Sequence, residues 1–149
     1  MQVTRLLFDR IADLLAADTD TLAAATALHV HLVINNFTPS LGTSLDDLDF
    51  ATFTGGAPKS AGTGEQQVFN DVTTGERVVQ LLEPAGGWTW ECTATPGAPE
   101  TVFGYAVTNT ANDELYGCAR LTAPITIDGE GQGFTVGNIR IPFSPALFS

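Results

Sequence analysis

Short runs of alternating apolar and polar residues, separated by turn residues about every eight to twelve positions, constrain this fold more than any other feature. Successive side chains of a β-strand point to opposite faces, so such runs predict strands with one buried face. The clearest run contains both tryptophans and would turn Trp88, Trp90, Cys92 and Ala94 inward. The turn spacing is typical of antiparallel sandwiches and small barrels. The sequence therefore predicts a mainly β fold, an antiparallel β-sandwich or small barrel with one N-terminal α-helix.

Two further stretches add detail to the expected sheets. Residues 66–70 and 76–82 flank a turn that ends in glycine, which predicts a β-hairpin. In the strand expected over residues 101–109, Gly104 and Ala106 leave room on one side for a large neighbour. We expect the tryptophan face to fill this room.

An amphipathic helix is expected near the amino terminus, over residues 4–17. Its apolar side chains recur at helical spacing, and Thr4 can serve as the N-cap. A helix of this length is marginal alone, so its apolar stripe must dock on the chain's own sheet or on a neighbouring subunit. We therefore divide the chain into a helical arm, residues 1–24, and a single β-rich domain, residues 25–149. The stripe consists of Leu7, Phe8, Ile11, Leu14 and Leu15.

The carboxyl-terminal stretch is a second candidate contact segment. Ile139, Ile141 and Phe143 alternate as in a strand, and the pattern then breaks at two prolines. Leu147 and Phe148 follow, and such large apolar residues are expected to pack against something. Two alternatives stay open: the tail binds a neighbouring subunit, or it folds onto its own domain.

Composition limits the class of partner. The chain has 149 residues, of which 44% are apolar and 15% charged, so part of its apolar surface is expected to face a partner. The net charge of −11 disfavours nucleic acid, because affinity for phosphate comes mainly from lysine and arginine. No run has transmembrane length and no secretory signal is visible, so we expect synthesis in the cytoplasm and no membrane partner. Cys92 and Cys118 are expected to be buried thiols rather than a disulfide.

Two histidines stand close together on an expected strand over residues 28–35. His29 and His31 would share one face, and the opposite face would carry Leu28, Val30, Leu32 and Ile34. A pair with this spacing can chelate a metal, but the segment supplies no third ligand, so an exposed pair without metal is favoured. The alternative is titration near neutral pH that modulates an interface.

Two other stretches contain residues found in ligand sites. Asp46, Asp47 and Asp49 lack the spacing of a calcium-binding EF-hand, which favours a solvated acidic turn, with a short helical turn beside it. The glycine-rich residues 55–64 lack the Gly-Lys-Ser/Thr order of a phosphate loop and are expected to form a surface loop.

No catalytic arrangement emerges from the sequence. Glu83 and Glu91 bracket the tryptophans and could act as the carboxylate pair of a glycosidase, but two solvated glutamates are favoured. The serines occur in no nucleophile elbow, and neither histidine has a nearby cysteine. We therefore expect no enzyme, no metal and no cofactor.

A family resemblance is carried by the leading helix, by the His/Val/Leu strand that ends in Asn-Asn-Phe-Thr-Pro-Ser at residues 35–40, and by three motifs. They are Leu-x-Asp-Leu-x-x-Ala-Thr-Phe-Thr-Gly-Gly at residues 45–56, Leu-Glu-Pro-Ala-Gly-Gly-Trp-Thr-Trp at residues 82–90, and the closing pattern from residue 125 to residue 141. With these motifs the chain resembles, from about residue 27 onward, small virion proteins of tailed bacteriophages. The resemblance implies a capsid decoration or cement protein, or a minor head or tail fibre protein. Such families are often β-rich and trimeric, hold no cofactor and act by burying surface.

The expected function is therefore that of a cement protein that stabilises the phage head. Its partner would be the major capsid protein, its location the virion, and its state a homo-oligomer, with a trimer favoured. The alternative is a receptor- or glycan-binding module of a phage fibre or tail, which would need an exposed aromatic or polar pocket. The expected partner-binding residues are the helix stripe together with Ile141, Phe143, Leu147 and Phe148.

Overall fold

The computed structural model describes the backbone of residues 2–3, 28–40, 42–61, 66–70, 77–81, 87–137 and 139–143, and the side chains of residues 28–40, 42–60, 87–137 and 139. Within these residues the chain is mainly β. The strands form three antiparallel sheets, none of which closes into a barrel, so the mainly β, antiparallel prediction is confirmed. The helix expected over residues 4–17 lies outside the described residues.

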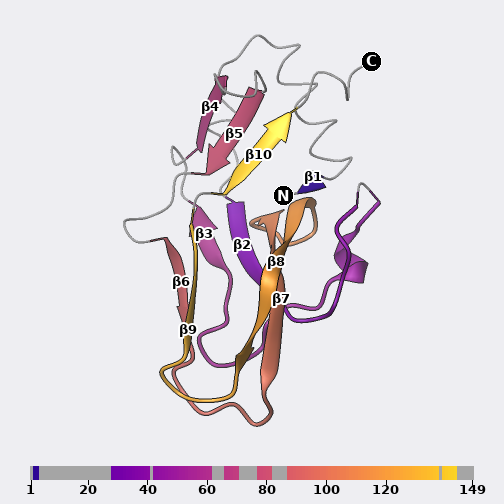
Figure 1. The fold of residues 1–149 in the computed structure, drawn as a ribbon. Coiled ribbons are helices and arrows are strands. Elements are labelled where there is room, and N and C mark those ends of the chain that lie inside the picture. Colours follow the sequence, from indigo (N-terminus) through magenta and orange to yellow (C-terminus); the bar gives the residue numbers. More distant parts are fainter. Residues whose placement is uncertain are drawn as a thin grey trace.

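A five-stranded sheet forms the central layer (Figure 1). Its strand order is β1-β8-β7-β2-β3, so sequence neighbours β7 and β8 form the long hairpin of the sheet. The outermost strands are short, with two residues in β1 and three in β3. The bounds are Gln2–Val3 for β1, Leu28–Val33 for β2, Lys59–Ala61 for β3, Glu100–Asn109 for β7 and Leu115–Ile127 for β8.

The register of β7 against β8 shifts twice, between Val102 and Gly104 and between Val107 and Thr108, and the first shift is the larger. Gly104 lies opposite Arg120, whereas Val102 lies opposite Ile125. Residues 121–124 of β8 therefore stand against a single residue of β7, and Pro124 in this stretch has no N–H to donate. Beyond the irregularity β8 pairs with β7 again, from Ile125 to Ile127.

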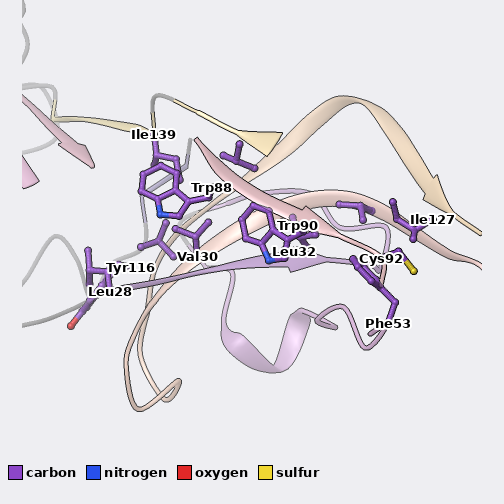
Figure 2. Close-up of a cluster of buried hydrophobic side chains, with 13 residues drawn as sticks. Leu28, Val30, Leu32, Phe53, Trp88, Trp90, Cys92, Tyr116, Ile127 and Ile139 are labelled. Atoms are coloured by element: carbon purple, nitrogen blue, oxygen red, sulfur yellow. The ribbon is translucent and has the colours of Figure 1, made fainter. Parts of the chain in front are cut away.

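The tryptophans pack on the first face of the central sheet. They belong to β6 (Trp88–Glu91), which pairs with β9 (Gly133–Val136) in a two-stranded sheet. Both rings are buried against residues of the central sheet, with Trp88 beside Val30 and Trp90 beside Leu32 (Figure 2). Two sheets that bury their facing side chains form a β-sandwich.

The inward row predicted for the tryptophan run is shorter than expected. Trp88, Trp90 and Cys92 are buried, but Ala94 is exposed. The alternation stops because β6 ends at Glu91 and the chain turns away from β9.

A loop covers the second face of the sheet. We call residues 34–40 and 42–50 the cover; they include the 3₁₀-helix η1 (Leu45–Asp47). The side chain of Asn35 closes the loop, since its amide donates to the Asp47 carbonyl at 2.8 Å and its oxygen accepts from the Asp49 N–H at 2.9 Å. Figure 1 shows η1 on the opposite side of β7 and β8 from β6 and β9.

The cover supplies the large neighbour expected beside Gly104 and Ala106. That neighbour is Phe37, and the tryptophans lie on the other face, so the predicted partner was wrong. A Cβ on Gly104 would lie 2.8 Å from the Phe37 ring and 2.3 Å from the carbonyl oxygen of Ala119. The second core consists of Val33, Phe37, Leu48, Ala106, Leu115 and Cys118, flanked by Leu45 and Phe50.

A third sheet, of order β10-β5-β4, lies at one end of the molecule (Figure 1). Its strands are β4 (Gln66–Asn70), β5 (Arg77–Leu81) and β10 (Arg140–Phe143). The antiparallel pairing of β4 with β5 confirms the predicted hairpin. Ile139, directly before β10, is fully buried beside Trp88 and ties this sheet to the first core (Figure 2).

Candidate functional site

The densest group of polar side chains in the described residues lies where β2 meets the turn between β7 and β8. We call His29, His31, Thr108 and Asn112 the histidine cluster. The two histidines share one face of β2, as predicted, but His31 is only 4% exposed. The expectation of an exposed pair was therefore wrong for His31, because the cover lies over this face and places the Phe50 ring 4.4 Å from the imidazole.

The Oδ1 atom of Asn112 is the shared acceptor of the cluster. It lies 2.9 Å from His29 Nδ1 and 3.1 Å from His31 Nε2. His31 Nε2 is also 2.9 Å from Thr108 Oγ1, whose hydroxyl donates to the Asn109 carbonyl at 2.8 Å. One tautomer satisfies each ring, with His29 protonated at Nδ1 and His31 at Nε2.

The turn that presents Asn112 has its own hydrogen bonds. Asn112 has a φ of 60°, a left-handed conformation that asparagine tolerates better than most residues. The Asn109 side-chain oxygen accepts from the N–H groups of Asp113 and Glu114, at 3.1 and 3.3 Å. The Glu114 carboxylate accepts from the Tyr116 hydroxyl at 2.9 Å. These bonds hold the acceptor in front of both imidazoles.

Electrostatics favour a neutral cluster. Burial lowers the pKa of His31, the hydrogen bond with Asn112 opposes this shift, and the positive form of His29 lowers the pKa further. The two ring centroids are 6.0 Å apart, so two imidazolium charges would repel each other. The surroundings of His31 therefore favour its neutral imidazole.

A metal ion finds few ligands here. The described residues contain no group of three or more histidine, cysteine, aspartate or glutamate side chains placed to hold one. Among the described residues, the side-chain oxygens that hydrogen-bond with the two imidazoles are the neutral ones of Thr108 and Asn112. Zinc sites are usually completed by thiolate, imidazole or carboxylate. Hydrogen bonding accounts for every distance in the cluster.

The tryptophans are structural. The Nε1–H of Trp90 donates to the Ala57 carbonyl at 2.8 Å, and that of Trp88 to the Ser60 carbonyl at 3.4 Å. Their rings are 0% and 1% exposed, so neither offers a face on which a sugar can stack.

The candidate acids lie apart from the histidine cluster's hydrogen bonds. Asp46, Asp47 and Asp49 are exposed around η1, where the Ser44 N–H and hydroxyl both donate to Asp47 and lower the pKa of its carboxyl. This confirms an acidic turn beside a short helical one. Glu91 is exposed on β6, and Glu83 lies outside the described residues.

The two cysteines are free and buried, as expected. Cys92 belongs to the first core and Cys118 to the second, so the central sheet separates them. Burial raises the pKa of the Cys118 thiol, which hydrogen-bonds with Thr43 of the cover.

The expected partner-binding residues fall in three places. Ile141 and Phe143 belong to β10, where they pair with Val79 and Arg77 of β5, so this part of the tail folds onto its own domain. Leu147 and Phe148 lie outside the described residues, as does the helix stripe of Leu7, Phe8, Ile11, Leu14 and Leu15.

Sequence reasoning missed Thr108, Asn109 and Asn112. The signal that could have found them was the density of short polar residues in Thr108-Asn-Thr-Ala-Asn-Asp, which favours turns whose side chains bond to the backbone. It also missed a clamp in which both carboxylate oxygens of Glu100 accept from Thr52, one from its N–H at 2.9 Å and one from its hydroxyl.

Comparison with protein-family models, curated proteins and solved structures found no match to this chain. Among the described residues, no helix has the length and apolar character needed to cross a membrane.

Proposed function

We propose that this chain is a structural protein of a tailed-phage virion, of the decoration or cement type, that binds the major capsid protein. It acts in this proposal as a homo-oligomer, with a trimer favoured, and performs no catalysis. Two features of the described residues support it: both tryptophans lie in the first core, and His31 is hydrogen-bonded within the histidine cluster.

One observation carries the proposal: the motif at residues 45–56 packs against Trp88 and Trp90, which end the motif at residues 82–90, and against the residues directly after them. Thr54 accepts from the Thr93 N–H at 2.9 Å, and Phe53 lies in the first core with both tryptophans. Gly55 has a φ of 104°, and a Cβ there would lie 1.9 Å from the carbonyl oxygen of Glu91. The first motif thus packs on the tryptophan strand, which supports reading the resemblance as a shared fold.

Binding to a shell in this proposal comes from apolar burial. A stable interface of ordinary size buries about 1,600 Å² in total, more than scattered surface contacts supply. The proposed contact residues are Leu7, Phe8, Ile11, Leu14 and Leu15, with Leu147 and Phe148 at the other end of the chain.

Sedimentation with capsid shells that lack the chain tests the proposal. We expect the native protein to co-sediment, and Leu7→Ser/Ile11→Ser to lose most of this binding. The matched control is Asp9→Ser/Asp13→Ser, which changes the polar residues of the same stretch and should bind as the native protein does. Its copy number in purified virions should be comparable with that of the major capsid protein.

The outcomes test the cement function and the assignment of the contact residues separately. A native protein that does not bind shells, or that is missing from virions, rules out the cement function. Native binding that survives Leu7→Ser/Ile11→Ser unchanged leaves the function standing and removes the helix stripe from the interface. A few copies for each virion would point to a fibre or tail position instead.

A further inference from the structure

The histidine cluster joins three parts of the fold. The His31 side chain extends from β2 of the central sheet toward the cover, where the centroid of the Phe50 ring lies 4.4 Å from that of the imidazole. Through Asn112 it also contacts the turn between β7 and β8. Within the described residues, the cover is paired with β2 at the isolated bridge between Val33 and Phe50. Next to this bridge the Ile34 N–H donates to the Asp49 carbonyl and the Ala51 N–H donates to the Leu32 carbonyl. The middle of the cover is held by side-chain contacts, which include the hydrogen bond from Arg120 to the Phe37 carbonyl.

The cluster has acceptors for neutral rings only. Asn112 Oδ1 and Thr108 Oγ1 receive the one N–H of each neutral imidazole. Protonation of His31 adds an N–H at Nδ1, and this atom has no hydrogen-bond partner within the part of the chain that the structure describes. A buried donor without an acceptor is costly, and a positive charge on His29, whose ring centroid lies 6.0 Å away, also disfavours the protonated form of His31.

No carboxylate compensates these charges by an ion pair within the described residues. In the turn, Asp113 and Glu114 accept from the Asn109 side-chain amide, and Glu114 also accepts from Tyr116. In the cover, Asp47 accepts from Ser44. The remaining acids of the cover, Asp46 and Asp49, are exposed.

The neighbouring strands supply no negative charge to the cluster. On β3, the neutral Ser60 lies opposite His29, whereas Lys59 lies opposite Val30 and so belongs to the other face of the sheet. On β8, Arg120 donates to the Phe37 carbonyl at 2.7 Å, and burial keeps the Cys118 thiol neutral by raising its pKa.

We propose that the histidine cluster is an acid-sensitive latch, which holds the cover closed while the His31 ring is neutral and releases it when His31 takes up a proton. Release exposes the second core, including Phe37 and Leu48, without separating the tryptophan layer from the first face. This inference does not depend on the virion assignment.

The direction of the pH effect follows from burial. Burial holds the pKa of His31 in the closed state below the ordinary histidine value of about 6.5. The closed cover therefore has its full stability above that value and loses it as the pH falls from there toward the lower closed-state pKa. Carboxylates titrate mostly below this range.

Amide hydrogen exchange of the purified chain at about pH 7.5 and about pH 5.5, corrected for intrinsic rates, tests the latch. We expect protection across residues 34–50 to fall by about tenfold or more at the lower pH, since each proton taken up changes the opening equilibrium up to tenfold per pH unit. Protection of β6 and β9 should stay unchanged. In His31→Gln the pH dependence should be lost.

If His31→Gln does not fold, a second variant tests whether protonation of the histidine cluster opens the cover. Asn112→Asp places a carboxylate beside both imidazoles, so it should keep the cover protected at about pH 5.5. Asn36→Asp adds the same charge at an exposed position of the cover and should behave as the native chain. The latch is wrong if the native cover stays protected at the lower pH, if Asn36→Asp protects as well as Asn112→Asp, or if β6 and β9 open together with the cover.

Discussion

Gly55 shows how closely two distant parts of this chain approach. It lies in the left-handed region, with a φ of 104°, and its Cα faces the carbonyl oxygen of Glu91. A side chain here meets backbone on the partner segment, which cannot rotate away as a flexible side chain can. Glycine is required both by the backbone conformation and by the space.

Gly55→Ala should destabilise the fold by at least about 2 kcal/mol, because strain at φ adds to the clash with Glu91. Gly97→Ala is the matched control, since nothing lies within 4 Å of a Cβ at Gly97. Its effect should stay within about 1 kcal/mol. Urea unfolding followed by tryptophan fluorescence measures both, and equal stability of the two variants would contradict the close approach.

At the scale of elements, the alternation along β6 separates a structural face from a solvent face. Trp90 is fully buried and bonded to Ala57, whereas Glu91 beside it is exposed. The strand places its large aromatic rings on one side and solvent-facing groups on the other.

Trp90→Ala should therefore cost about 3–5 kcal/mol of unfolding free energy, or prevent folding. Glu91→Ala, the control on the adjacent position, should change stability by less than about 0.5 kcal/mol. Calorimetry measures both. A folded Trp90→Ala variant of native stability would show that the ring serves a partner instead of the core.

The sequence predicted individual strands better than their partners. Alternation identified β2, β6 and β7, and a short connection identified the β4–β5 hairpin. The pairing of β6 with β9 was not predictable, because two long strands intervene and alternation carries no information about distant pairing.

The candidate site was harder to predict than the strands. Alternation correctly placed His29 and His31 on one face of β2, but it does not tell whether a loop covers that face. The sequence did contain a signal for such a loop, because residues 34–50 include several large apolar side chains that a solvated loop would not contain. These are Phe37, Leu45, Leu48 and Phe50.

The edges of the central sheet bear on how copies of the whole molecule meet. Its outermost strands, β1 and β3, are short. β1 pairs only with Gly117 and Cys118 of β8 among the described residues, and the next part of β8 contains Arg120 and the irregular residues 121–124, which include Pro124. Charges, proline and irregular pairing are features by which proteins prevent uncontrolled strand addition. Contacts between copies are then expected from side-chain surfaces.

At the same scale, the two thiols should react at different rates. Cys118 becomes accessible when the cover opens, whereas Cys92 requires separation of the tryptophan layer. With a disulfide reagent at neutral pH, Cys92→Ala, which retains Cys118, should be labelled faster than Cys118→Ala. Equal rates would mean that the two layers open as one unit.

Because each core contains one thiol, the extent of modification at each cysteine reports how often that core opens. The central sheet separates the two thiols, so they do not cross-link with each other and each reports on its own core. Mass spectrometry after a brief oxidative or alkylating pulse would measure both extents of modification in one sample, in solution or inside an assembled particle.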